Sequence, residues 1–170
     1  MFDLQHNRIG ENTPMEKATR EACFMLYLNQ GDHMGTFKEE ITLENIVDRG
    51  LAERKYIGEA QIRRLTVEAM PDTGAWTLVI NEDIREKLGL TIEKSNESSL
   101  VGGKISNYPI TEPVKIQWKD RNIELPAVVV AEAKNVLLGA LPLEAMDLIV
   151  DPVRKQLAGA HGDQPLHILC

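Results

Sequence analysis

The chain has 170 residues, of which 43% are hydrophobic, and this is enough for one globular domain with its own core. A formal net charge of −7 and the lack of a basic cluster argue against a nucleic-acid-binding surface, which needs cations to neutralise phosphates. The sequence contains no run of about 18 apolar residues, so we expect no membrane-spanning helix.

The sequence also bears on the cellular compartment. The N-terminal residues lack the charged and then apolar pattern of a signal peptide. The two cysteines, Cys23 and Cys170, lie far apart, in segments that we expect to be mobile. A reduced, cytoplasmic protein is therefore the simplest interpretation.

Residues 1–33 form a predicted N-terminal extension that differs from the rest of the chain. Thr13, Pro14 and Glu16 have the pattern of a helix start, and apolar residues then recur roughly on one helical face. One interpretation is a regulatory cap over the domain that follows. We favour an extension that packs loosely or is disordered, or a natural start at Met34, since termini are usually poorly ordered.

The first predicted elements of the main domain are two strands and the connection between them. The strand over residues 36–43 has its apolar residues on one face. The charged residues 46–59 predict a solvated loop and not a binding patch. A second strand, over residues 60–70, then leads towards Asp72.

An Asp-Thr-Gly sequence between two apolar strands is the most informative part of the chain. Asp72 lies between that strand and a predicted strand over residues 76–80, and an ionised carboxylate is costly to bury unless it is paired or hydrogen-bonded. Gly74 permits a tight turn, and the Thr73 hydroxyl can tie the loop down. We therefore predict a carboxylate presented on a rigid, buried turn. The tripeptide alone is ordinary in turns, so its context decides its meaning.

A helix and a hairpin are predicted next. The helix begins after Asn81, a good capping residue, and ends at Gly89. Two strands over residues 90–108 then flank Gly102 and Gly103, a pair typical of a tight hairpin turn.

The remaining part of the domain reads as short strands and one short helix. A half-buried strand over residues 114–118 turns back into residues 123–130. An apolar strand over residues 136–139 ends on a glycine, residues 142–146 predict a short helix, and residues 148–150 predict a final buried strand.

The C-terminal tail, residues 158–170, contains residues of the types that bind metals. His161, Asp163, His167 and Cys170 are these residues, but their spacing matches no common metal site. We predict a flexible or interface-forming tail and no metal.

Two motifs and their order resemble a known family. Residues 72–75, Asp-Thr-Gly-Ala, come first; a glycine-containing hairpin follows; and residues 137–139, Leu-Leu-Gly, lead into a helix and a terminal strand. This arrangement resembles the retropepsin-like aspartic proteases, the single-lobed relatives of the retroviral protease, over about residues 35–157. The resemblance implies a dimeric, all-β acid-protease barrel with one or two short helices, in a domain over residues 34–157.

The resemblance implies an aspartic endopeptidase that needs no cofactor. Such an enzyme activates a water between two carboxylates, yet this chain has one Asp-[Ser/Thr]-Gly sequence, so the site would form across a homodimer. The implied catalytic residues are Asp72, Thr73, which would hydrogen-bond across the two-fold axis, and Gly74. The implied substrate-binding residues are Ala75, Leu138 and Gly139, together with Val101, Gly102 and Gly103 in a mobile flap.

One residue departs from the family pattern. The family usually has an aliphatic residue directly before the aspartate, and this chain has Pro71, which fixes φ and removes an amide donor. The alternative function is a non-catalytic peptide-binding or scaffold dimer that keeps the fold. A plain structural β-domain would explain neither the two motifs nor their order. The expected partners are a second copy of the chain and a peptide or protein substrate, with no nucleic acid and no membrane.

Overall fold

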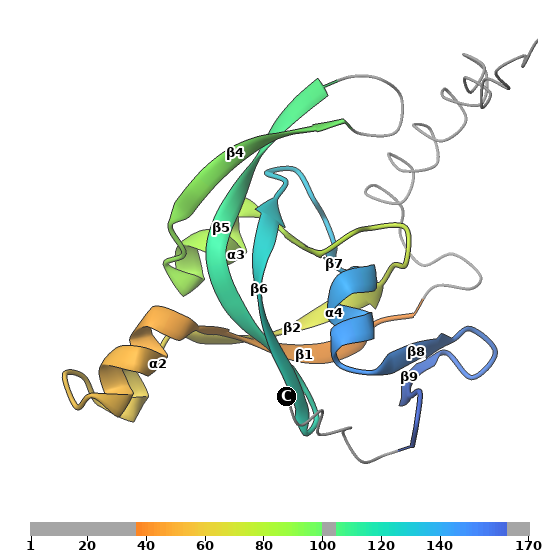
Figure 1. The fold of residues 1–170 in the computed structure, drawn as a ribbon, viewed down its shortest axis with the longest axis horizontal. Coiled ribbons are helices and arrows are strands. Elements are labelled where there is room, and N and C mark those ends of the chain that lie inside the picture. Colours follow the sequence, from red (N-terminus) through yellow and green to blue (C-terminus); the bar gives the residue numbers. More distant parts are fainter. Residues whose placement is uncertain (1–36, 100–104, 163–170) are drawn as a thin grey trace, which may run out of the picture.

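The computed structural model describes residues 37–99 and 105–162, and these residues form a mostly β structure (Figure 1). Six strands close into a barrel in the order β1-β2-β7-β3-β6-β5, because β1 pairs with both β2 and β5. A further strand, β4, pairs with β5 outside this ring. The barrel strands are β1 (Glu39–Asn45), β2 (Arg64–Pro71), β3 (Leu78–Ile80), β5 (Ile105–Trp118), β6 (Arg121–Val129) and β7 (Val136–Leu138). The all-β prediction is confirmed.

The buried apolar side chains form one large core cluster and a second, smaller cluster around Met70, Ala75 and Leu137. The predicted inward face of β5 is confirmed, because Val114, Ile116 and Trp118 are all buried. Leu43 on β1 shows how the ring closes, since it is opposite Leu65 on β2 and Ile116 on β5. Alternate residues of a strand point to the same face of the sheet, so every second residue of these strands places its side chain in the core.

The second strand of the predicted hairpin and the strand predicted after it form one continuous strand, β5. β5 has 14 residues and pairs first with β4 (Ile92–Ser99) and then with β6 and β1. The register of β5 against β6 shifts between Ile110 and Pro113, and such irregularities bend a strand. The paired ends of β4 and β5 project from one end of the barrel (Figure 1).

The predicted solvated loop over residues 46–59 is wrong: it contains a helix, α2 (Ile46–Glu53), and a short 3-10 helix, η1 (Glu59–Gln61). Asn45 caps α2, because its side chain accepts hydrogen bonds from the amides of Val47 and Asp48 at 2.9 and 3.0 Å. The same buried side chain donates to the Leu88 carbonyl at 2.9 Å. Because the 3-10 helix takes up residues 59–61, the strand predicted from residue 60 begins only at Arg64.

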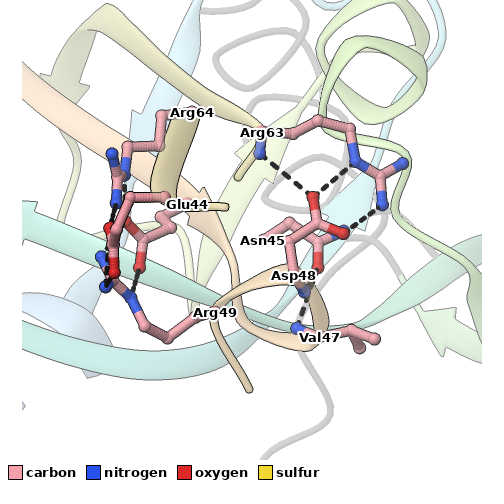
Figure 2. Close-up of polar contacts among 8 residues, drawn as sticks. Glu44, Asn45, Val47, Asp48, Arg49, Arg63 and Arg64 are labelled. Carbon is pink, nitrogen blue, oxygen red and sulfur yellow. Dashed lines mark hydrogen bonds and ion pairs between the residues drawn. The ribbon is translucent and has the colours of Figure 1, made fainter. Parts of the chain in front are cut away.

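Two of the charged residues that suggested a loop, Asp48 and Arg49, instead form ion pairs around α2 (Figure 2). The Asp48 carboxylate is buried and accepts two bonds from the Arg63 guanidinium, both at 2.7 Å. These bonds hold the pKa of Asp48 below its ordinary value. Glu44, also buried, accepts hydrogen bonds from Arg49 at 2.8 and 2.9 Å and from Arg64. The two arginines join α2 and β2 to β1.

Glu44 should make the fold sensitive to acid. Mainly because of the hydrogen bond from Arg49, its pKa falls from 4.5 to about 2 although burial opposes this shift. A carboxylate with a depressed folded-state pKa stabilises the fold above the unfolded pKa, and this contribution is lost as the pH falls from about 4.5 to about 2. We expect Glu44→Gln to lower the free energy of unfolding at pH 7 by up to about 3 kcal/mol.

The measurement is urea unfolding of the wild type and Glu44→Gln between pH 7 and pH 2. The difference between the two should shrink as the pH falls, because the wild type also loses the Glu44 charge. Glu40→Gln is the matched control, since Glu40 is an exposed carboxylate on the same strand. A pH-independent difference for Glu44→Gln would contradict the assignment.

The two other α-helices match their predictions. α3 (Glu82–Leu88) begins after Asn81, whose side chain accepts from the Ile84 amide at 3.0 Å. It ends at Gly89, whose φ of +61° is in the left-handed region that favours glycine. α4 (Ala140–Ala145) is the predicted short helix and begins slightly earlier than expected. Among the described residues, no helix is long and apolar enough to cross a membrane.

The C-terminal part of the domain forms a small second sheet. β8 (Leu148–Asp151) was predicted as the final, buried strand, but Ile149 is 50% exposed and a further strand, β9 (Gln156–Gly159), pairs with it. β9 crosses the predicted start of the tail at residue 158. Glu39 attaches it to the barrel by accepting a hydrogen bond from the Leu157 amide at 2.9 Å.

A buried arginine holds the start of β6 to the segment around this small sheet. Arg121 donates to the carbonyls of Met146, Asp147 and Gly162, and forms an ion pair with the Asp147 carboxylate at 3.0 Å. The Asp147 carboxylate also bonds to His161 at 2.7 Å. These contacts lower the pKa of Asp147, and the hydrogen bond with His161 contributes most to the shift.

Candidate active site

The structure places the two sequence motifs side by side. β2 delivers Asp72 and runs parallel to β7, with Pro71 opposite Leu138. The Asp72 amide donates to the Leu138 carbonyl at 2.9 Å. This bond fixes the backbone at the aspartate relative to the strand of the second motif.

Gly139 follows that strand and packs directly against the loop after Asp72. A Cβ atom at Gly139 would lie 2.4 Å from the Thr77 carbonyl oxygen and 2.7 Å from that of Ala75. Only a residue without a side chain permits this approach. The second motif therefore supplies space for the loop that carries Asp72.

The first amides of α4 also bind this loop. The Ala140 amide donates to the Ala75 carbonyl at 2.8 Å, and the Leu141 amide donates to the Trp76 carbonyl at 2.9 Å. The first amides of a helix have no partner within the helix, so the loop carbonyls satisfy them. The loop and α4 therefore lie next to each other in the fold (Figure 1).

The Asp72 carboxylate is held locally and remains open to solvent. The Gly74 amide donates to its Oδ1 at 2.9 Å, and the side chain is only partly buried. No ion pair of Asp72 is found among residues 37–93 and 108–162, whose side chains the structure describes. A carboxylate in this state can bind a water or a second acidic group.

Gly74 serves the carboxylate through its lack of a side chain. Its φ is not in the left-handed region, so a turn that only glycine can adopt is not the reason for this residue. A Cβ atom here would lie 3.1 Å from the Asp72 Oδ1. Gly74 therefore keeps the space beside the carboxylate free.

The prediction of a buried turn is wrong for a single chain. Thr73 and Gly74 are exposed, and only Ala75 is buried. The Thr73 hydroxyl forms no hydrogen bond within the described part of the chain, so it does not tie the loop down there. The buried Thr77 does this instead, by donating its hydroxyl to the Pro126 carbonyl at 3.2 Å. No pattern in the sequence indicates this role of Thr77.

The strand after the turn is also shorter than predicted. It begins at Leu78 and not at residue 76. Trp76, which was predicted to lie in this strand, is in the loop and 73% exposed. The apolar character of the run gave no signal that one of its members faces solvent.

Pro71 is compatible with the local backbone. Successive amides of a strand point to opposite sides, and the Asp72 amide points to β7, so an amide at residue 71 would point towards β1. The ladder between β1 and β2 ends at Glu39 and Ala69, before residue 71 is reached. The missing donor of Pro71 therefore removes no ladder bond, as expected for proline at the end of a strand.

The predicted flap is described only in part. Val101, Gly102 and Gly103 lie outside the described residues. The strands that flank them are paired up to Ser99 and Ile105, so the hairpin itself is present.

The predicted absence of a metal site concerns both the barrel and the tail. Within the described ranges, no group of three or more His, Cys, Asp or Glu residues is placed to hold a metal ion. Of the tail residues with metal-binding side chains, His161 pairs with Asp147, and Asp163, His167 and Cys170 lie outside the described residues.

Comparison with protein families identifies the part of the chain that contains both motifs. Residues 58–141 match the sequence model of the family described as aspartyl protease. The resemblance to the retropepsin-like aspartic proteases is thereby confirmed. The matched range includes the loop over residues 72–77, which we call the aspartyl protease loop after the matched family, and it extends through Gly139 to the start of α4.

Several solved structures are similar to part of this chain. A retropepsin-like aspartic protease from Rickettsia conorii is 16% identical, with a TM-score of 0.44, over 68% of this chain and 87% of that one. The retroviral protease-like domain of Ddi1 from Leishmania major is 15% identical, with a TM-score of 0.44, over 62% and 90%. The EIAV protease in complex with the inhibitor HBY-793 is 26% identical, with a TM-score of 0.36, over 46% and 75%. No curated protein matches the chain significantly.

Proposed function

We propose that this chain is an aspartic endopeptidase that acts as a homodimer. The observation that carries the proposal is the aspartyl protease loop: a partly exposed Asp72 carboxylate on a backbone fixed by Leu138, Gly139 and α4. A rigid site of this kind positions a catalytic group before substrate arrives. The family match supports hydrolysis of peptide bonds as the reaction.

The second carboxylate would come from a second copy of the chain. The chain has one Asp-Thr-Gly sequence, and the reaction needs one carboxylate as base and one as acid. In a two-fold dimer, Asp72 of each subunit would lie on the axis. The exposure of Thr73 and Gly74 in a single chain supports this assembly, because both residues are free to contact the same turn of a partner.

The two carboxylates would share one proton and bind the attacking water. Two like charges about 3 Å apart cannot both be present, so one group stays protonated. The ionised group takes a proton from the water as it attacks the peptide carbonyl, and the protonated group donates to the substrate. The apparent pKa values of such a site belong to the pair and not to either residue.

The substrate would be a peptide in an extended conformation. The enzyme would act on it in the cytoplasm. An extended peptide can add its backbone hydrogen bonds to strands at the edge of a site, as peptides bound by β-augmentation do. The hairpin of β4 and β5 would act as the flap, and Val101, Gly102 and Gly103 would contact the peptide. On the other side, Ala75, Leu138 and Gly139 would line the peptide path.

A mixing experiment tests whether one site needs two subunits. A fixed amount of wild type is incubated with increasing Asp72→Asn protein, long enough for subunits to exchange, and peptide cleavage is measured. At an equal amount of variant, random pairing leaves half of the wild-type subunits in wild-type dimers, so activity should fall to about half. Unchanged activity would place the whole site within one chain.

The alternative, a peptide-binding or scaffold dimer, is separated by turnover. It predicts that folded dimers bind peptides and cleave none of them, at any pH from acidic to neutral. The assay should use a high protein concentration, because a weak dimer dissociates on dilution and would look inactive.

A further inference from the structure

Trp76 is a large apolar side chain in an unexpected position. The chain has two tryptophans. Trp118 is in the core, 4% exposed, with its indole N–H directed to Glu39 at 3.3 Å. Trp76 is 73% exposed, although it follows Asp72 by four residues and is flanked by the buried residues Ala75 and Thr77.

The backbone below Trp76 is held rigidly. Its carbonyl accepts the Leu141 amide, the carbonyl of Ala75 accepts the Ala140 amide, and the Thr77 hydroxyl donates to β6. Gly139 packs against the same three-residue segment. The exposed indole is therefore presented from a fixed base, and fixing it in a complex costs less conformational entropy than ordering a mobile loop.

Trp76 is also close to the reacting bond of the proposed site. Four residues of fully extended chain span at most about 14 Å, so the Cα atoms of Asp72 and Trp76 are no farther apart than this. An extended peptide advances about 3.3 Å per residue. A substrate that passes over Asp72 and continues along this loop would bring a side chain within reach of the indole no more than about four residues from the cleaved bond.

We propose that Trp76 is a specificity-determining residue, which binds a bulky apolar side chain of the substrate close to the cleaved bond. This inference rests on the proposed function and adds a preferred substrate chemistry to it. Apolar surface on both partners favours contact, and aromatic rings gain further from stacking. Leu141, whose amide bonds to the Trp76 carbonyl, is apolar and only partly buried, which extends the apolar character of this area.

The test has two readouts, and the first is independent of cleavage. In the Asp72→Asn background, peptides bind without turnover, and Trp76 fluorescence reports the contact because Trp118 is buried. The probes are two peptides from a sequence that the wild type cleaves, one with its bulky apolar residues near the bond kept and one with each of them replaced by alanine. The first peptide should shift the emission, and the shift should disappear in Asp72→Asn/Trp76→Phe, whose remaining tryptophan is in the core.

The second readout is cleavage of the same two peptides. Trp76→Ala should lower kcat/KM about tenfold or more for the apolar peptide and leave the alanine peptide nearly unchanged. Trp76→Phe should retain most of the preference. Tyr56→Ala is the matched control, because Tyr56 is a 75% exposed aromatic in the turn after α2, and α2 stands away from α4.

The outcomes separate this inference from the proposed function. Equal losses for both peptides, or an emission that already shifts when the peptide-free dimer forms, would make Trp76 a subunit contact and overturn the inference. Cleavage with no effect of Trp76→Ala would overturn it too, while the protease function stands. If the wild type cleaves nothing, the proposed function fails. Apolar and alanine-rich peptides from a random library then serve as probes of binding. A shift in Trp76 emission with the apolar peptides alone would still support the contact.

Discussion

Replacing Asp72 by asparagine is expected to lower kcat/KM for peptide cleavage by at least about a thousandfold. Asparagine has the same shape but cannot take a proton from water or pass one to the substrate. Its amide oxygen can still accept the Gly74 amide bond, so we expect the free energy of unfolding to change by less than about 0.5 kcal/mol. The assay is cleavage of a diverse peptide library at high protein concentration, from acidic to neutral pH.

The subunit contact should survive this substitution. The wild-type pair shares one proton and so carries one negative charge, whereas two asparagines carry none and can still hydrogen-bond to each other across the axis. The variant dimer should therefore be at least as stable as the wild-type dimer at neutral pH. Analytical ultracentrifugation of both proteins measures this, and it ensures that a loss of activity is not a loss of assembly.

Asp83→Asn is the matched control for the activity assay. Asp83 is an exposed carboxylate on α3 that pairs with Lys87 at 2.7 Å, so its removal should change activity by less than twofold. Equal cleavage by wild type and Asp72→Asn would point to a contaminating protease. Cleavage by neither protein, with both still dimeric, would favour the binding-module alternative.

The largest expected effect on stability is that of Gly139→Ala. The new Cβ would lie 2.4 to 2.7 Å from three backbone atoms of Ala75 and Thr77, and backbone cannot rotate away as a flexible side chain can. Either the aspartyl protease loop or α4 must move. We expect a loss of about 3 kcal/mol or more, a lowering of Tm by roughly 10 °C, and a loss of activity.

Gly50→Ala is the control for the glycine substitution. Gly50 lies within α2, and a Cβ at this position has no atom within 4 Å. Alanine favours a helix over glycine by about 0.5–1 kcal/mol, so this variant should be as stable as the wild type or slightly more stable. Thermal unfolding of the three proteins gives the comparison. An unchanged Tm for Gly139→Ala would contradict the close packing of loop and strand.

The resemblance to the family predicted the barrel, and the sequence itself predicted the order of the two motifs. Strong alternation predicted the inward face of β5, and good capping residues predicted α3. The family resemblance named Leu138 as a substrate-binding residue, but no local pattern predicted that it lies beside Asp72. The contact itself is between residues 66 positions apart (138 − 72). No local rule of sequence reports a backbone bond over that distance.

The wrong predictions concern charged or apolar segments in which neighbouring residues have different environments. Asp48 and Arg49 looked like surface residues, but their partners, Arg63 and Glu44, are in other elements, so the helix around them was missed. Trp76 looked like a strand residue because its neighbours are apolar, yet only those neighbours are buried. In both cases tertiary contacts decided the structure, and a single sequence does not contain them explicitly.

The bonds between α4 and the aspartyl protease loop have a consequence for motion. The amides of Ala140 and Leu141 can exchange their hydrogens with solvent only when the loop carbonyls of Ala75 and Trp76 move away. The loop and the start of α4 should therefore open together, as one cooperative unit. Hydrogen exchange at these two amides would then measure how often the loop after Asp72 opens, even though neither amide belongs to that loop.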